Sequence, residues 1–304
     1  MPCVTFAPVQ LALDRPSTRA RIGGFVALTK PRIIELLLVT TVPTMIVAEQ
    51  GLPSLWLVLA TVVGGALAAG GANAVNMYVD RDIDAVMHRT RNRPLVTGLV
   101  APGEAMVFAV ALEVAAFALL WVAVNPLSAV LAVSATAFYV FVYTLWLKRT
   151  STSNIVIGGA AGAVPVLVGW AAVRNSLDWA PLVLFAVIFV WTPPHFWALA
   201  VKYRDDYAAA HVPMLPAVAS LHTTAVRILA YTVVLWVLTL VFVPVAGMGA
   251  LYTVAAVALG AVFTALAVRL LRTPTAPVAM RLFSWSITYV TLLFGAMAVD
   301  RLVS

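Results

Sequence analysis

Three polar side chains recur every four residues in a chain that is otherwise rich in apolar residues. They are Asn76, Asp80 and Asp84. On a helix a step of four residues advances about 400°, so the three form one slowly drifting stripe. Asp82 lies two residues from the stripe and should point largely the other way. Carboxylate oxygens suit Mg²⁺, which usually takes one or two carboxylates together with substrate phosphates. The stripe is therefore a candidate metal site.

A run of arginines follows the stripe. Arg89, Arg91 and Arg93 alternate with polar residues just before Pro94. Guanidinium groups bind phosphate oxygens through paired N–H donors. The whole stretch therefore predicts a site for a divalent cation and a diphosphate. The simpler alternative is a solvated interfacial loop in which aspartates and arginines pair with one another.

A second acidic segment lies at residues 201–223. Its adjacent Asp205 and Asp206 would be about 100° apart on a helix, so both need not face one ion. Lys202 stands four residues before Asp206, and a simple helical ion pair is one interpretation. In the other, one of these aspartates completes the metal site, and Lys202 and Arg204 bind the diphosphate. The predicted metal ligands are Asn76, Asp80, Asp84 and Asp206.

Aromatic residues and one histidine are the remaining candidates for chemistry. Loss of a diphosphate would leave an allylic carbocation, which aromatic faces can stabilise, and Tyr139, Tyr143 and Trp197 are candidates. They could equally be packing or interfacial residues. His195 follows Pro193–Pro194 inside an apolar run. It is either a hydrogen-bonded structural residue or a substrate contact that coordinates iron or carries a proton.

The elements that carry these residues must be membrane helices. Apolar residues make up 63% of the 304 positions and charged residues 10%, too few charges to cover a soluble domain. Apolar windows of about 20 residues, long enough to cross a bilayer, recur along the chain. We predict an all-α, polytopic membrane protein with nine spans: 32–50, 52–74, 104–124, 127–146, 154–173, 179–200, 224–246, 249–270 and 282–300.

Positive charge is distributed unevenly about these spans. If the N-terminus is cytoplasmic, 17 lysines and arginines fall on that side, while only Arg174 and Arg301 fall on the other. This bias sets the orientation, with the N-terminus cytoplasmic and the C-terminus outside. The bias also explains the net charge of +7, because the excess lysines and arginines lie on the cytoplasmic side. The expected partner is the lipid bilayer, and we expect no binding of nucleic acid. The first 20 residues resemble neither a cleaved signal nor a mitochondrial presequence, so we expect a bacterial inner membrane.

The predicted organisation is a cytoplasmic tail at 1–23 and one intramembrane domain at 24–304. The two long loops, 75–103 and 201–223, both fall on the cytoplasmic side, and each follows an even-numbered span. We expect function where these loops face each other. Gly158 and Gly162 predict close helix packing or close approach to a substrate. Pro165, Pro193 and Pro194 should bend or interrupt their helices.

With these residues in view, the chain resembles the UbiA superfamily of intramembrane prenyltransferases, and within it the branch that farnesylates haem. The resemblance runs in order from about residue 24 to 298. The segments that carry it are LTKPR at 28–32, NMYVDRDIDAVMHRTRNRPL at 76–95, YTLWLKRTSTSNIVIGGAAGAVPVLVGW at 143–170, WTPPHFWALA at 191–200, YRDDY at 203–207, VPMLP at 212–216 and FSWSITYVTLLF at 283–294.

The resemblance implies a nine-helix bundle around a central cavity and transfer of a farnesyl group from farnesyl diphosphate to a vinyl group of haem b, giving haem O. Asn76, Asp80 and Asp84 match the family's Mg²⁺ and diphosphate residues. The second acidic motif is thinner, because Tyr203 and Tyr207 stand where relatives that act on quinone precursors carry further aspartates. A second complete Mg²⁺ site is therefore in doubt.

The resemblance also bears on two histidines and on the rival functions. The TPPHFW segment is similar to the haem branch, which makes His195 the candidate for haem contact, and His211 stands where the family usually has glycine. Haem O would pass to a haem A synthase or a terminal oxidase. One rival is a related enzyme acting on an aromatic quinone precursor. The other is a secondary transporter, although its ion site should lie at the midplane rather than at helix ends.

Overall fold

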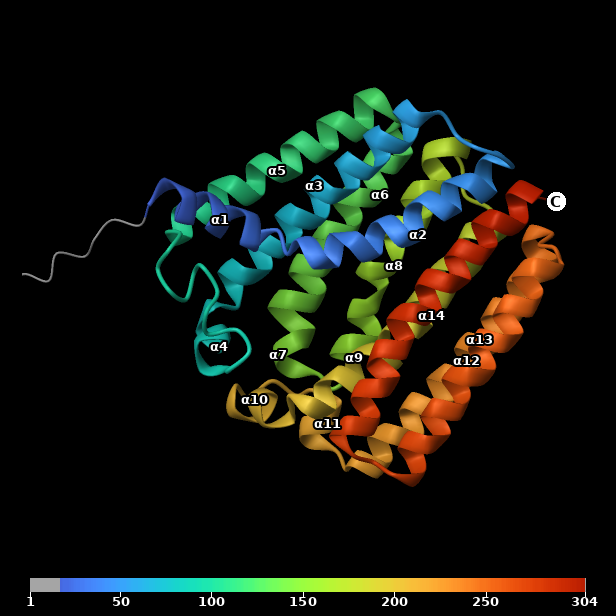
Figure 1. Ribbon diagram of the computed structural model, residues 1–304. Helices are drawn as coiled ribbons and strands as arrows, with labels where there is room; N and C mark the ends of the chain where they lie inside the picture. Colours follow the sequence, from blue (N-terminus) through green and yellow to red (C-terminus); the bar gives the residue numbers. More distant parts are fainter. Residues whose placement is uncertain (1–16, 304) are drawn as a thin grey trace, which may run out of the picture.

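The computed structural model describes residues 17–303, with the side chains of all of these except 32–38. Within that part every regular element is a helix, as Figure 1 shows. Residues 1–16 of the predicted tail lie outside the described residues, and the rest of the tail enters α1 (Thr18–Leu28), a helix that we did not predict.

Nine long helices account for the nine predicted spans among the described residues. Eight of them are long and apolar enough to cross a membrane. The ninth is α2 (Pro31–Glu49), whose described apolar part is Val39–Glu49. The eight are α3 (Leu55–Val79), α5 (Pro102–Ala123), the continuous segment Pro126–Thr150, α8 (Asn154–Arg174), α9 (Trp179–Lys202), α12 (Leu221–Ala246), α13 (Ala250–Arg272) and α14 (Ala276–Val303). The predicted all-α membrane class is confirmed, and the boundaries agree to within a few residues.

Several of these helices begin at a side chain that caps the first turn. Ser54, Asn125, Asp178 and Ser220 each accept a hydrogen bond from a backbone N–H two or three residues ahead, at 2.8–3.2 Å. Such caps satisfy N–H groups that have no partner inside the helix. The short connections therefore carry the signals that start α3, α6 (Pro126–Ala137), α9 and α12.

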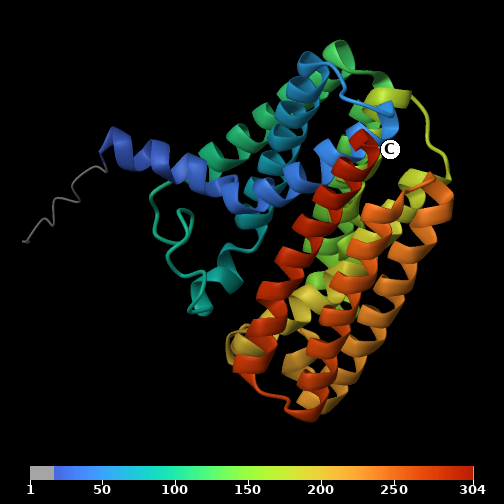
Figure 2. The same cartoon turned by 45° about the vertical axis from the view of Figure 1, so that its right-hand side comes forward.

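Four short helices gather at one end of the bundle. These are α4 (Arg81–Val86), α7 (Lys148–Thr150), α10 (Arg204–Ala209) and α11 (Leu215–Val218), and Figure 1 shows them away from the C-terminus. The two views place α3 and α5 on one side of the bundle and α12, α13 and α14 on the other (Figures 1 and 2). The long loops 75–103 and 201–223 thus meet at a single end.

The opposite end is fixed by the last turn of α14. The buried carboxylate of Asp300 accepts hydrogen bonds from the N–H groups of Gly249 and Tyr252, at 2.6 and 3.1 Å. Arg301 donates to the carbonyl oxygen of Ala246 at 2.5 Å. One pair of adjacent residues therefore caps the start of α13 and the end of α12.

Two expectations need correction. The prolines do not interrupt their helices, since α8 continues through Pro165 and α9 through Pro193 and Pro194. The predicted loop 75–103 begins inside a helix, because α3 extends to Val79. Flanking helices and side chains can supply partners for carbonyls that a proline leaves unpaired. The hydroxyl of Thr41 on α2 also donates to the carbonyl of Pro165 itself at 3.5 Å, which links the two helices.

Candidate active site

The predicted polar stripe forms at the junction of α3 and α4. Asn76 lies in the last turn of α3, Asp80 joins the two helices, and Asp84 lies in α4. All three are buried, at 3%, 0% and 2% exposure, while the side chain of Asp82 is 60% exposed. The four-residue spacing therefore placed the stripe on one inward face, with Asp82 turned away, as predicted.

Asp80 is the most enclosed member of the stripe. Its Oδ2 accepts a hydrogen bond from Nδ2 of Asn76 at 2.6 Å and another from Nζ of Lys148. Its Oδ1 lies 3.7 Å from the guanidinium of Arg149 and has no hydrogen-bond partner among the described residues. An ionised carboxylate is costly to bury unless cations surround it. The arrangement leaves one oxygen of this carboxylate available to a further cation.

A ten-residue π-helix, Phe138–Leu147, lies against the stripe and continues into α7. Thr144 lies 3.2 Å from Nδ2 of Asn76, and Lys148 pairs with Asp80. Thr144 and Lys148, four residues apart, thus contact Asn76 and Asp80, which are also four residues apart. π-helical geometry is rare and is frequently found at functional sites. Here it belongs to the segment that faces both polar positions.

The π-helix also presents two stacked tyrosines. The rings of Tyr139 and Tyr143 lie 5.4 Å apart with an interplanar angle of 22°. Gly158 of α8 permits this packing, because a Cβ at that position would lie 2.3 Å from Cδ2 of Tyr143. The corresponding position at Gly162 has nothing within 4 Å. The close packing predicted for these glycines therefore applies to Gly158, and its neighbour is a candidate active-site ring.

The arginines after the stripe divide into one inward and two outward residues. Nη1 of Arg93 contacts Oδ2 of Asp84 at 2.5 Å, with 18% and 3% of the two side chains exposed. Arg89 and Arg91 are exposed. Aspartate–arginine pairing, which was the simpler alternative to a metal site, is therefore present at Asp84, although this pair is largely buried rather than solvated.

The second acidic segment meets the first through Asp206. Oδ2 of Asp206 accepts a hydrogen bond from the backbone N–H of Arg89 at 3.1 Å. The ring of Tyr203 lies 5.5 Å from Arg89 and 5.5 Å from Lys202. Asp205, Arg204 and Lys202 are exposed. The two loops therefore face each other as expected, and Asp206 rather than Asp205 makes the connection.

The alternative helical pair between Lys202 and Asp206 is not formed within the described part of the chain. Helix α9 ends at Lys202 and α10 starts at Arg204, with Tyr203 between them. This break removes the continuous helical geometry that an i,i+4 pair needs. Asp206 is instead turned toward the loop of Arg89.

Positive charge dominates the electrostatics of the buried site. Burial, reinforced by Arg93 and Lys148, lowers the pKa of Lys30 to about 7. At the exposed edge, the hydrogen bonds from Arg149 lower the pKa of Asp82 to about 2. Both N–H···O distances in that pair are 2.7 Å. Asp80 and Asp84 oppose the lowering of the pKa of Lys30, but burial and the two neighbouring cations outweigh them.

The protein alone does not complete a metal centre. Among the described residues no group of three or more His, Cys, Asp or Glu side chains could hold a metal ion. Asp84 is paired with Arg93, and Oδ1 of Asn76 accepts a hydrogen bond from Lys30 at 2.9 Å. The free Oδ1 of Asp80 nevertheless fits Mg²⁺, which needs few protein oxygens when substrate phosphates supply the rest.

His195 lies apart from the carboxylates, buried between α9 and α14 at 8% exposure. Its ring stacks on Trp191, with centroids 4.3 Å apart, and Phe283 lies 4.7 Å away. Trp197 is also buried and packs edge-on against Tyr231 of α12, rather than with the tyrosine pair. The structure therefore groups Tyr139 and Tyr143 with the stripe and leaves Trp197 in the core.

Sequence reasoning assigned no chemical role to several residues of this site. Lys148 and Arg149 were counted only toward membrane orientation, although their position at a helix end after an apolar run could have marked them. Ser286 gave no signal, because a lone serine in a span is common. The residues that the structure adds are Lys30, Thr144, Lys148, Arg149 and Ser286.

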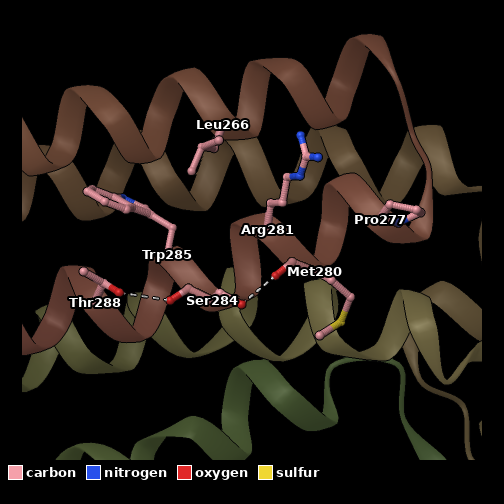
Figure 3. A pocket seen from close by; sticks show the side chains of 7 residues that line it. All are labelled: Leu266, Pro277, Met280, Arg281, Ser284, Trp285 and Thr288. Carbon is pink, nitrogen blue, oxygen red and sulfur yellow. Dashed lines mark hydrogen bonds between the residues drawn. The ribbon is translucent and has the colours of Figure 1, made fainter.

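A separate pocket lies between α13 and α14. It has a volume of about 440 Å³, and Figure 3 shows its lining, which includes Leu266, Arg281 and Trp285. None of the predicted site residues lines it.

Known proteins resemble this chain over most of its length. The model of the UbiA prenyltransferase family matches residues 37–294. A protoheme IX farnesyltransferase of Renibacterium salmoninarum is 52% identical over 93% of this chain and 91% of its own length. That of Frankia casuarinae is 55% identical over 93% of this chain and 99% of its own.

Solved structures share the fold at low sequence identity. A structure of digeranylgeranylglyceryl phosphate synthase has a TM-score of 0.77 at 16% identity, over 93% of this chain and 99% of its own. A UbiA homologue from Archaeoglobus fulgidus, bound to GPP and Mg²⁺, has a TM-score of 0.65 at 14% identity, over 90% and 99%. The family model spans most of the chain, and the curated relatives exceed half identity across it. This chain is a member of the UbiA prenyltransferase family.

Proposed function

We propose that this prenyltransferase transfers the farnesyl group of farnesyl diphosphate to a vinyl group of haem b, giving haem O. Support comes from relatives named protoheme IX farnesyltransferase, which are 52–55% identical over more than nine-tenths of the chain. The observation that carries the chemistry is the enclosed carboxylate of Asp80, whose Oδ1 has no hydrogen-bond partner among the described residues and lies 3.7 Å from Arg149, while Lys148 pairs with its Oδ2. This combination suits a metal-bridged diphosphate.

The diphosphate would bind at the stripe. Asp80, Asp84, Asn76 and Asp206 are the residues proposed to hold Mg²⁺, which when bound stabilises the leaving diphosphate by neutralising its charge. Arg93 lies inside the site and would exchange Asp84 for a phosphate oxygen, since guanidinium groups bind both kinds of anion. Further proposed diphosphate contacts, at the open side of the site, are Arg89, Arg91, Lys202 and Arg204.

The bond changes of the reaction define what the rest of the site must do. The C–O bond between the farnesyl C1 and the diphosphate breaks, and the oxygen keeps the electron pair. The vinyl group of haem b then forms a C–C bond to C1. Water adds to the resulting cation and loses a proton, leaving a hydroxyethylfarnesyl side chain. Tyr139 and Tyr143 present stacked rings beside the stripe, where aromatic faces favour the allylic cation.

His195 is the proposed haem contact, held among aromatic rings between α9 and α14. We further propose a bacterial inner membrane, with the N-terminus and the acidic loops cytoplasmic. The product would pass to a haem A synthase or a terminal oxidase, because haem O needs further oxidation or incorporation into an enzyme.

The test is a product assay with the purified protein in detergent. Farnesyl diphosphate and Mg²⁺ are supplied with haem b in one reaction and with an aromatic quinone precursor in another, and products are identified by mass spectrometry. We expect haem O only, with no product after EDTA chelation and recovery on adding Mg²⁺. Prenylation of the quinone precursor alone would assign the rival function within the same family.

A further inference from the structure

Ser286 of α14 receives two side chains from successive turns of α9. Its carbonyl oxygen accepts a hydrogen bond from Nε1 of Trp191 at 2.9 Å. Its hydroxyl oxygen lies 2.7 Å from Nδ1 of His195, and Ser286 is fully buried. The two contacts tie the segment around His195 to one residue of the last helix.

The position of the serine hydrogen determines which nitrogen of His195 is protonated. Oγ of Ser286 lies 2.6 Å from the carbonyl oxygen of Phe283. Two oxygens this close repel unless a hydrogen lies between them, and about 2.7 Å is the usual length of an O–H···O bond. A serine has a single hydroxyl hydrogen. The hydroxyl therefore donates to Phe283, and toward His195 it can act only as an acceptor.

It follows that Nδ1 of His195 carries the hydrogen of this contact. A neutral imidazole has one N–H, so its other nitrogen, Nε2, holds an unshared electron pair. Among the described residues Nε2 has no hydrogen-bond partner, and the neighbours of the ring are aromatic: Trp191, Phe196 and Phe283. A charged imidazolium would lack a compensating anion here. The Trp191 and Phe283 rings also limit reorientation of the imidazole.

We infer that Ser286 is a positioning residue that holds the proton of His195 on Nδ1, so that Nε2 is offered to the iron of haem b. The inference depends on the proposed function, because it takes haem b as the substrate. A hydrogen bond from the distal nitrogen of a ligating histidine is the general means by which proteins fix its tautomer.

The first experiment uses the unaltered protein and needs no substrate. NMR of protein labelled with ¹⁵N at histidine reports separately on Nδ1 and Nε2, and His195→Gln identifies the signals by their loss. We expect a protonated Nδ1 and an unprotonated Nε2. The reverse tautomer, or a ring protonated at both nitrogens near neutral pH, would overturn the inference.

The second experiment measures binding of ferric haem b by its Soret absorption and its EPR spectrum. In Ser286→Ala the Nδ1 hydrogen loses its acceptor, and we expect about tenfold weaker binding with a changed iron-ligand signature. Ser286→Thr keeps a hydroxyl and should restore the wild-type signature. Ser284→Ala is the matched control, because Ser284 is exposed two residues away and bonds only within α14 (Figure 3).

The outcomes separate this inference from the proposed reaction. If Ser286→Ala binds haem b with wild-type affinity and spectrum, Ser286 does not position the ligand, whatever the product assay gives. If the tautomer and the binding series follow expectation but no haem O forms, the reaction assignment fails and the role of Ser286 stands. If Ser286→Ala does not fold, the tautomer in the unaltered protein decides.

Discussion

Nζ of Lys30 lies 2.9 Å from Oδ1 of Asn76, across 46 residues of sequence. The orientation of the Asn76 amide is fixed by its second contact, because Oδ2 of Asp80, 2.6 Å from Nδ2, can only accept a hydrogen bond, which leaves Oδ1 as the acceptor for Lys30. In this form Asn76 therefore orients Asp80. The four-residue spacing predicted that Asn76 is a metal ligand. To bind the ion, Oδ1 of Asn76 would have to release the hydrogen bond from Lys30.

Lys30 makes this contact from a strained backbone. Its φ of 52° lies in the left-handed region, which residues with a Cβ rarely adopt. Such strain costs on the order of 1–3 kcal/mol and persists where the surroundings hold it, often at functional sites. The bend between α1 and α2 thus directs an ammonium group into the polar stripe.

Substitution of the buried aspartates should lower activity far more than substitution of Asp82. We expect Asp80→Asn and Asp84→Asn each to lower haem O formation by about a hundredfold or more, because they remove charge where a metal and diphosphate would bind. Asp82→Asn, at an exposed position on the same segment, should stay within about threefold of wild type. Initial rates by mass spectrometry, with size-exclusion profiles to verify folding, measure this. Equal losses in all three variants would contradict the inward stripe.

The pair between Lys148 and Asp80 should contribute strongly to stability. Only 13% of the lysine side chain and none of the aspartate is exposed. Lys148→Met removes one partner of a buried pair and should lower the free energy of unfolding by about 3 kcal/mol, with Lys148→Arg closer to wild type. Breaking the exposed Arg149–Asp82 pair by Asp82→Asn should cost less than about 1 kcal/mol. Unfolding in detergent, followed by circular dichroism, measures both variants. Similar losses of stability in Lys148→Met and Asp82→Asn would contradict the prediction.

A methyl group at Gly158 should disturb the tyrosine pair. The added Cβ would overlap Tyr143, so Gly158→Ala should cost about 1–3 kcal/mol of stability and reduce turnover. Gly162→Ala, one turn along α8 in open space, should be neutral or slightly stabilising. Thermal unfolding and product assays on both variants measure the contrast. A tolerated Gly158→Ala would show that Tyr143 can move without consequence.

His211 occupies a position suited to glycine. Its φ of 53° lies in the left-handed region, which glycine adopts without the strain that a Cβ imposes. Because His211 is exposed, His211→Gly should relieve the strain and raise stability by up to about 1 kcal/mol, with turnover unchanged. A thermal shift assay is sufficient to measure it. A clear loss of stability would mean that contacts of the His211 imidazole stabilise the fold by more than the backbone strain costs.

The helices and the stripe were predictable because both follow from local periodicity. Apolar length determined the spans, and the four-residue spacing from Asn76 to Asp84 determined which face turns inward. The end of α3 was misplaced, since residues 75–79 adjoin the charged run that begins at Asp80 and were assigned to its loop, although helical geometry continues to Val79. Tertiary contacts to Lys148 and Thr144 stabilise that last turn, and local sequence does not contain them.

The partners of the stripe could not be predicted, because they come from distant segments. Lys30 and Lys148 reach Asn76 and Asp80 across 46 and 68 residues. The choice of Asp206 over Asp205 depended on the break in helix at Tyr203, which no residue pattern indicated. The π-helix could likewise not be predicted, since an apolar and aromatic run of this kind is equally compatible with an ordinary α-helix.

The tie between His195 and Ser286 has a consequence for biogenesis. Ser286 lies on α14, the last helix among the described residues, while His195 lies 91 residues earlier on α9. During synthesis the ring of His195 is therefore in the membrane well before its partner has been translated. A nascent or truncated chain that lacks α14 has a histidine without its acceptor, so the proposed haem contact would become competent only once α14 has been inserted.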